Sequence, residues 1–223
     1  MFRPPSLRSP ARISVLASGG GSNLQALIDH FAGPAAAVGA ITFVASEQEG
    51  AGALGRARAA GIATGVIDAP RDSDAILSLL DTAKTDVLVL AGYLKLIPDG
   101  VVRAFHGRLL NVHPSLLPAF GGPGMYGARI HAAVLARGVR LTGVTVHFVD
   151  DQFDRGPIIA QWPVPVRPDD DVATLAARVL RTEHQLLPIC VEAVACGAIT
   201  LGEDGRVHGE VGMPADLAPR TPR

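Results

Sequence analysis

Short apolar runs alternate with amphipathic stretches along the first half of the chain. Five runs have the length of buried β-strands: 13–17, 40–45, 62–67, 87–94 and 109–113. Apolar residues at helical spacing predict helices between them, at 24–31, 51–60 and 76–80, with a further short helix after Pro98. Repeated strand–helix–strand units predict an α/β fold with a doubly wound, mostly parallel sheet and a Rossmann-like N-terminal half.

The pattern changes in the second half of the chain. After a helix at 128–137, strong alternation at 142–149 and a second run at 157–166 predict an antiparallel C-terminal edge. A long helix is expected within 171–195, bent or interrupted near Pro188, followed by a terminal hairpin at 197–208. No repeat or linker divides this region, so residues 12–209 are expected to form one catalytic domain.

The two ends of the chain differ from this region. Residues 1–11 and 210–223 are rich in proline and lack an apolar periodicity, so they are expected to be flexible tails. The basic N-terminal segment leaves a transit peptide as an alternative interpretation.

Composition narrows the classes of function. The 223 residues carry 20 Lys and Arg against 21 Asp and Glu, a formal net charge of −1, which argues against a protein that wraps a polyanion. Hydrophobic residues make up 48% and charged residues 18%, which excludes a disordered chain or a coiled coil. Aromatic residues, at 4%, are too few for the stacking surfaces that bind single-stranded nucleic acid. No apolar run has membrane-spanning length.

The two cysteines match no metal-binding or redox spacing. Cys190 and Cys196 are predicted to be buried hydrophobic side chains of a protein in a reducing compartment, hence cytoplasmic.

A glycine-rich turn separates the first strand from the first helix. Gly19, Gly20 and Gly21 permit a close backbone approach, and the following helix start presents unpaired amides, which together suit a phosphate group. The turn is neither a Walker A loop nor a complete dinucleotide motif. The alternative is a tight turn in which Ser22 caps the helix.

Two polar side chains end the strand at 109–113. Asn111 and His113 are two residues apart, so both point to the same face, where an amide and an imidazole could stabilise an oxyanion. The alternative is a capped strand that contains a core histidine.

Asp154 follows the strand at 142–149 within an acidic segment. It suits a turn, a partner for His113 that raises the pKa of the imidazole, or, with Asp150 and Asp151, a Mg²⁺ site. No phosphate-binding lysine supports a metal site here, so no metal ion is expected. His147, within that strand, is predicted to be a buried structural residue.

Four segments together resemble one family of enzymes. They are ASGGGSNLQALID (17–29), DVLVLAGYLKLI (86–97), LLNVHPSLLPAF (109–120) and TVHFVDDQFDRGPII (145–159). From about Ile13 to His208 the chain resembles the phosphoribosylglycinamide formyltransferase family, folate-dependent enzymes of purine biosynthesis. The turn at 18–23 distinguishes this family from other enzymes that use 10-formyltetrahydrofolate.

The resemblance implies a reaction and its residues. It implies formyl transfer from 10-formyltetrahydrofolate, a co-substrate, to the amino group of glycinamide ribonucleotide, without a metal. The implied catalytic residues are Asn111, His113 and Asp154. The residues implied to bind the ribonucleotide are Gly21, Ser22, Asn23 and Glu183. The residues implied to bind folate are Leu94, Lys95, Leu96, Ile97, Asp150, Asp151, Gln152, Phe153 and Asp154.

Some positions depart from the family pattern. Asp74 occupies the position that aligns with a folate-contacting arginine of the family, and Arg71 is the arginine near it. Pro123 and Leu180 replace polar residues of relatives. These changes are expected to affect the affinity for the substrates, not the reaction. Alternatives are another formyl-folate transferase, a formyl-folate hydrolase, or a ligand-sensing module with a decayed site. No nucleic acid or membrane partner is expected, and both a monomer and a homodimer agree with the sequence.

Overall fold

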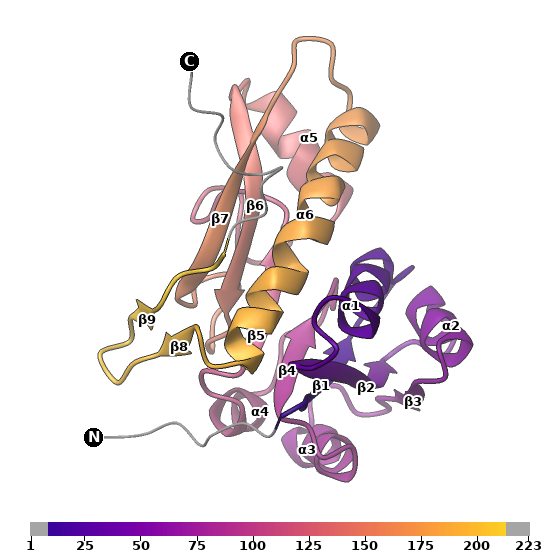
Figure 1. The fold of residues 1–223 in the computed structure, drawn as a ribbon. Helices are drawn as coiled ribbons and strands as arrows, with labels where there is room; N and C mark the ends of the chain where they lie inside the picture. Colours follow the sequence, from indigo (N-terminus) through magenta and orange to yellow (C-terminus); the bar gives the residue numbers. More distant parts are fainter. Residues whose placement is uncertain (1–8, 213–223) are drawn as a thin grey trace.

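A mixed β-sheet with helices on both faces forms the centre of the molecule (Figure 1). The computed structural model describes residues 9–212. The strands of this sheet are β1 (Ala11–Leu16), β2 (Gly39–Ser46), β3 (Ala63–Val66), β4 (Val87–Leu90), β5 (Leu109–His113), β6 (Leu141–Phe148) and β7 (Ile158–Pro165). The helices are α1 (Ser22–Ala32), α2 (Gly52–Ala59), α3 (Ser73–Thr82), α4 (Asp99–Ala104), α5 (Ala128–Ala136) and α6 (Val172–Ala195).

The order of the strands confirms the predicted fold class. The seven strands follow the order β3-β2-β1-β4-β5-β6-β7, in which β1 to β5 are parallel and β6 and β7 are antiparallel to their neighbours. Each β-strand was predicted to within a few residues. The predicted terminal hairpin is also present, as β8 (Thr200–Leu201) paired with β9 (Val207–His208).

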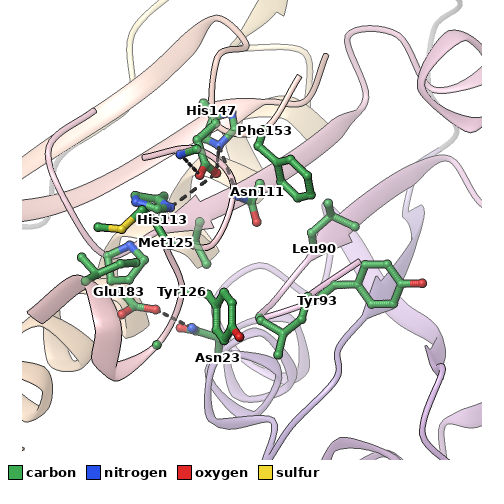
Figure 2. A pocket seen from close by; sticks show the side chains of 18 of the residues that line it. Asn23, Leu90, Tyr93, Asn111, His113, Met125, Tyr126, His147, Phe153 and Glu183 are labelled. Atoms are coloured by element: carbon green, nitrogen blue, oxygen red, sulfur yellow. Dashed lines mark hydrogen bonds and ion pairs between the residues drawn. The ribbon is translucent and has the colours of Figure 1, made fainter. Parts of the chain in front are cut away.

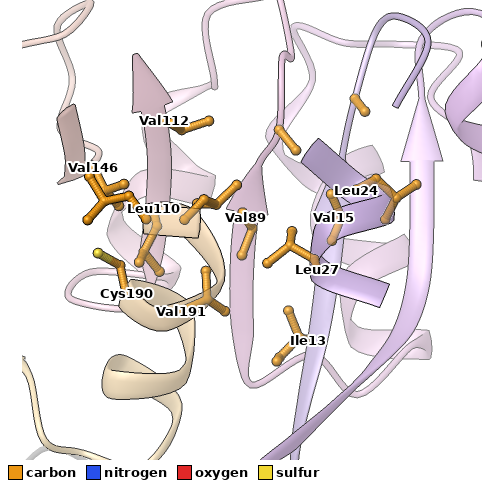
Figure 3. Close-up of a cluster of buried hydrophobic side chains, with 14 of the residues drawn as sticks. Ile13, Val15, Leu24, Leu27, Val89, Leu110, Val112, Val146, Cys190 and Val191 are labelled. Atoms are coloured by element: carbon orange, nitrogen blue, oxygen red, sulfur yellow. The ribbon is translucent and has the colours of Figure 1, made fainter. Parts of the chain in front are cut away.

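Two hydrophobic clusters explain why the central strands are continuously apolar. In β4, Val87 and Val89 belong to the cluster beneath α1, α2, α5 and α6, while Leu88 and Leu90 belong to the cluster beneath α3 and α4. Because both faces of β4 are covered, polar residues would be buried on either side. Figure 3 shows the first cluster, where α1 and α6 pack on the sheet.

Helix α6 crosses this face of the sheet and contributes residues to the functional site. It begins with a capping box between Asp171 and Thr174 and continues for 24 residues with Pro188 inside. The helix was predicted to be bent or interrupted near Pro188; it is not interrupted there. The neighbouring Leu186, Leu187 and Cys190 are fully buried, and this packing offsets the backbone hydrogen bond that a proline removes.

The cysteine prediction holds for only one residue. Both thiols are free, but Cys190 is buried and Cys196 is exposed. Cys196 is the C-cap of α6, where the chain leaves the core, which explains the error. Within residues 9–212, none of the helices combines the length and the apolar character needed to cross a bilayer. Most of the predicted tails, residues 1–8 and 213–223, lie outside the described residues.

Candidate active site

A cavity of about 700 Å³ opens at the carboxyl ends of the parallel strands (Figure 2). Ligands of doubly wound sheets bind at this edge, where the direction of chain connection reverses. The cavity is lined by the segment after β4, the end of β5, the loop before α5, the segment after β6 and one side of α6. It therefore collects residues that are far apart in the sequence.

Strand β5 places two of the implied catalytic residues in this cavity. Asn111 and His113 both line it, as their two-residue spacing predicts. In the antiparallel pairing with β6, Asn111 lies opposite His147, and His113 lies opposite Thr145. His147 and Thr145, the partners on β6, were not predicted to belong to the site. The alternation of side chains along two adjacent strands is the signal that would have found them.

Asp154 reaches the same point from the loop after β6. Its backbone has a φ of 57°, and its side chain lies beside His113, with 3.4 Å between Oδ1 and Nδ1. The amide of Gly122 donates to Oδ2 at 2.9 Å. Burial on its own would raise the pKa of Asp154, but the hydrogen bond and charge of His113, with the Gly122 amide, outweigh burial and lower it. The carboxyl group is therefore charged at neutral pH.

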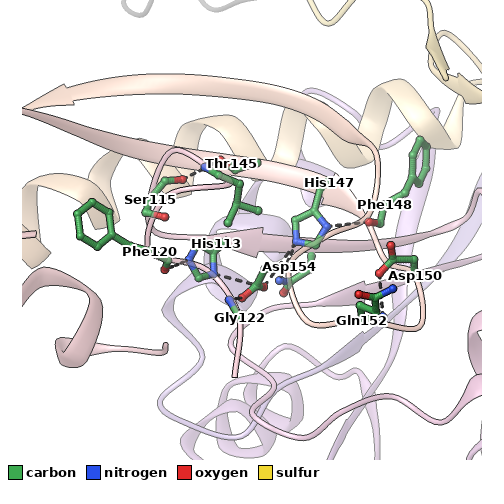
Figure 4. Close-up of polar contacts among 12 residues, drawn as sticks. His113, Ser115, Phe120, Gly122, Thr145, His147, Phe148, Asp150, Gln152 and Asp154 are labelled. Atoms are coloured by element: carbon green, nitrogen blue, oxygen red, sulfur yellow. Dashed lines mark hydrogen bonds and ion pairs between the residues drawn. The ribbon is translucent and has the colours of Figure 1, made fainter. Parts of the chain in front are cut away.

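The surroundings of His113 suit an imidazolium ion. Its Nε2 donates to the carbonyl of Phe120 at 2.9 Å, while its Nδ1 faces Asp154 (Figure 4). Both ring nitrogens thus face oxygen acceptors, and only the doubly protonated ring can donate to both.

His147 lies on the other side of Asp154 and has different partners. Its Nδ1 lies 2.7 Å from the carbonyl of Phe148 and is therefore the donor nitrogen, so its Nε2 accepts from Asn111 Nδ2 at 3.2 Å. Burial lowers the pKa of His147, so the ring is neutral at neutral pH. The predicted burial is confirmed, since 2% of the residue is exposed. The prediction missed that this residue orients Asn111.

A buried hydrogen-bond network holds the loop that serves His113 and Asp154. Thr145 Oγ1 donates to the carbonyl of Ser115 at 2.7 Å and accepts from the amide of Leu117 at 3.0 Å. Gln161 donates to the same hydroxyl at 3.0 Å and to the carbonyl of Leu117 at 2.9 Å. Because this loop continues to Phe120, the network fixes the carbonyl that His113 contacts.

The opposite end of the cavity contains two of the residues implied to bind the ribonucleotide. Asn23 Nδ2 donates to Glu183 Oε2 at 2.6 Å, and both side chains line the cavity (Figure 2). Burial raises the pKa of Glu183, against the effects of Asn23 and of the charge on His113. Ser22 lies on the other side of the glycine turn, in a second cavity.

Gly21, rather than Ser22, is the N-cap of α1. Its φ is 74°, and no side chain caps the helix, so the alternative of a Ser22 cap is wrong. A Cβ at Gly21 would lie 2.7 Å from Ala53 Cα, so the turn needs glycine both for its conformation and for its packing on α2.

Most of the residues implied to bind folate line the same cavity. Leu94, Leu96 and Phe153 line it and remain 39–49% exposed. Lys95, Ile97, Gln152 and Asp154 also line it, whereas Asp150 and Asp151 are absent from its lining. Asp150 Oδ1 instead accepts from the amide of Gln152 at 2.9 Å, which shapes the loop.

Other lining residues were not predicted. Met125 and Tyr126 come from the loop before α5, and His131 comes from α5 itself. His131 is buried, and burial, followed by the charge of His113, lowers its pKa. Among residues 9–212, no three His, Cys, Asp or Glu side chains are grouped as a metal ion would require.

The chain is similar to known proteins along most of its length. A formyl transferase family profile matches residues 11–191. Phosphoribosylglycinamide formyltransferase from Mycobacterium tuberculosis is 41% identical over 201 residues, which cover 89% of this chain and 90% of that protein. The trifunctional purine biosynthetic protein adenosine-3 of Bos taurus is 43% identical over 204 residues. This match covers 88% of the chain but only 20% of the bovine protein, so the chain spans about a fifth of that relative.

The fold is also shared with solved structures. The crystal structure of phosphoribosylglycinamide formyltransferase from Anaplasma phagocytophilum aligns with a TM-score of 0.81 and 36% identity, covering 89% of this chain and 94% of that one. Both comparisons confirm the resemblance of the four sequence segments. The chain therefore belongs to the formyl transferase family and, within it, to the phosphoribosylglycinamide formyltransferases.

Proposed function

We propose that this protein transfers the formyl group of 10-formyltetrahydrofolate to the amino group of glycinamide ribonucleotide in purine biosynthesis. The observation that carries the proposal is the position of Asp154 beside His113 and His147, with Asn111 held alongside. Formyl transfer requires an oxyanion to be stabilised and an amine proton to be removed, and these side chains supply groups for both tasks.

The two substrates would approach this cluster from opposite ends of the cavity. Leu94, Leu96 and Phe153 offer an apolar surface to the folate ring system, while Asn23 and Glu183 offer polar groups to the sugar of the ribonucleotide. We propose that Gly21, Ser22 and Asn23 contribute the amides of α1 to its phosphate. Bringing both substrates together would supply much of the rate acceleration.

Each residue of the cluster has a distinct task in the proposed mechanism. Asn111 has one amide proton directed to His147, which leaves the second for the developing oxyanion. Both nitrogens of His113 face protein acceptors, so its contribution in this arrangement is the positive charge. Asp154 maintains that charge and, directly or through water, accepts the proton of the attacking amine. Collapse of the tetrahedral intermediate then breaks the bond between the formyl carbon and N10, which takes up a proton as tetrahydrofolate leaves.

The decisive experiment is to incubate the protein with 10-formyltetrahydrofolate in the presence and absence of glycinamide ribonucleotide. We expect tetrahydrofolate to form only with the ribonucleotide, together with formylated ribonucleotide detected by mass spectrometry. Equal release of formate without the amine would instead identify a hydrolase and contradict the proposal.

We further propose that residues 12–209, together with Ala11 at the start of β1, form the catalytic domain, flanked by tails at 1–10 and 210–223, in a cytoplasmic protein that is a monomer or a homodimer. The continuous sheet and the free thiols of Cys190 and Cys196 support the domain and the reducing compartment. Size-exclusion chromatography with light scattering would measure the oligomeric state.

A further inference from the structure

A second cavity, of about 720 Å³, lies on the outer side of the glycine turn. It is lined by α1, by α6 and by Arg56 of α2. Consecutive residues line the two cavities: Asn23 and Glu183 line the main cavity, while Ser22 and His184 line the second. The start of α1 and the segment of α6 at 183–184 therefore border both cavities.

The two cavities differ in the positive charge that they offer near the turn. Among the described residues that line the main cavity, Lys95 is the single Lys or Arg, and it belongs to the folate end. Near Glu183, α6 presents the apolar Leu180 to the same cavity. In the second cavity, Arg56 is the single Lys or Arg among the described lining residues.

Arg56 is held beside the first turn of α1. Its Nε donates to the carbonyl of Gly20 at 2.8 Å, and its Nη1 donates to Gln25 Oε1 at 3.3 Å. The amide of Ala53 donates to the carbonyl of Gly19 at 3.0 Å, so α2 also supports the turn through its backbone. The guanidinium group is therefore fixed next to a helix start that no side chain caps.

Two enclosed polar atoms at this junction have no hydrogen-bond partner among the described residues. They are Oδ1 of Asn23, a residue that is 8% exposed, and Nε2 of His184. Burial, followed by the positive charge of Arg56, lowers the pKa of His184. Arg56 is therefore close enough to His184 for its charge to act on a second residue of this cavity.

We propose that Arg56 supplies the positive charge that binds the 5′-phosphate of the ribonucleotide, with the sugar held by Asn23 and Glu183. This inference rests on the proposed function. A phosphate monoester carries a charge of about −1.5 to −2 at neutral pH, whereas a helix start offers only about +0.5, so the amides of α1 leave most of the charge uncompensated. Arg56, an exposed residue of α2, compensates this charge.

The test compares Arg56→Gln with Arg56→Lys and with Arg58→Gln, a matched control at an exposed arginine of the same helix. Affinity is measured by isothermal titration calorimetry for glycinamide ribonucleotide and for its dephosphorylated ribonucleoside, and inorganic phosphate serves as a competitor. Thermal unfolding confirms that each variant is folded.

We expect Arg56→Gln to weaken ribonucleotide binding by about tenfold or more, as for a lost charge-assisted hydrogen bond, and to weaken ribonucleoside binding by less than about twofold. Arg56→Lys should recover part of the loss, Arg58→Gln should resemble the wild type, and phosphate should compete less well with Arg56→Gln.

Equal losses for the two ligands, or equal losses in the Gln and Lys variants, would mean that Arg56 only supports Gly20, and would overturn the inference. An unchanged affinity in Arg56→Gln would overturn it as well. If the wild type binds the ribonucleotide but fails to formylate it, the proposed function fails and the binding comparison still decides the role of Arg56.

Discussion

The two sides of Asp154 contain the same type of residue with different hydrogen-bond partners. His113, on β5, and His147, on β6, are 3% and 2% exposed, and both approach Asp154 Oδ1, at 3.4 and 3.9 Å. On the β5 side, both nitrogens of His113 face oxygen atoms. On the β6 side, His147 donates to a carbonyl and accepts from an amide.

The difference shows that hydrogen-bond partners, rather than burial, separate the two roles. An imidazole between two acceptors is stabilised as a cation, whereas an imidazole between an acceptor and a donor is stabilised as the neutral tautomer. The neighbouring strands thus place, on either side of one carboxylate, a histidine that faces two oxygen atoms and a histidine that accepts from an amide, which is an arrangement that suits acid–base chemistry.

Removing the charge of Asp154 should cause the largest loss of activity. Asp154→Asn leaves His113 without its anionic partner and removes the proton acceptor, so kcat should fall by about 10²–10⁴-fold. Ribonucleotide binding, measured by calorimetry, should remain close to that of the wild type, because Asn23 and Glu183 are at the other end of the cavity. A kcat near that of the wild type would exclude the proposed role.

Replacing the neutral histidine tests the β6 side. His147→Phe removes the acceptor of Asn111 while keeping a ring in the buried position, so kcat should fall by about tenfold through loss of the orientation of Asn111. Steady-state kinetics should show little change in KM for either substrate. A larger effect than that of Asp154→Asn would reverse the proposed importance of the two sides.

Substitution of Thr145, in the hydrogen-bond network that holds the loop next to His113, should have a smaller effect, and the same strand offers a matched control. Thr145→Val should lower kcat by several-fold and reduce the free energy of unfolding by about 1–3 kcal/mol, because buried groups of the loop lose their partner. Thr145→Ser should restore both quantities.

Thr142→Val is the matched control on the same strand. Thr142 is 2% exposed, and its hydroxyl has no hydrogen-bond partner within residues 9–212, so its replacement should be neutral or slightly stabilising. Equal losses in the Thr142 and Thr145 variants would show that β6 is merely sensitive to substitution.

The smallest expected effect concerns pH. Burial lowers the pKa of His147 below its ordinary value of 6.5, so the unfolded chain binds its proton more readily than the folded chain does. The associated stability is complete above pH 6.5 and is lost as the pH falls towards the folded-state pKa. The pKa values of His131 and His184 are lowered too and add in the same direction.

Thermal unfolding should therefore show a Tm that decreases between pH 7 and pH 5.5, with a shallower decrease in His147→Phe. The contribution of Asp154 appears at lower pH, because its pKa is lowered from 3.8. An identical decrease in wild type and variant would show that His147 is not the residue responsible.

Much of the fold and the identity of several site residues follow from local patterns in the sequence. The uninterrupted apolar run of β4 predicts a strand covered on both faces, and the spacing of Asn111 and His113 predicts a shared face. The glycine turn before α1 predicts a close backbone approach. These features depend on residues that are adjacent in the chain, which is why periodicity and turn chemistry reveal them.

Other features depend on contacts between distant segments and arise only in the tertiary structure. The pairing of β5 with β6 brings His147 to Asn111, and the loop after β5 delivers the carbonyl of Phe120 and the amide of Gly122 to His113 and Asp154. The packing of α2 on the glycine turn places Arg56 beside α1. The sequence by itself thus determined which chemical groups the site contains, whereas the tertiary structure decided which partners each histidine faces, because those partners come from segments that only folding brings together.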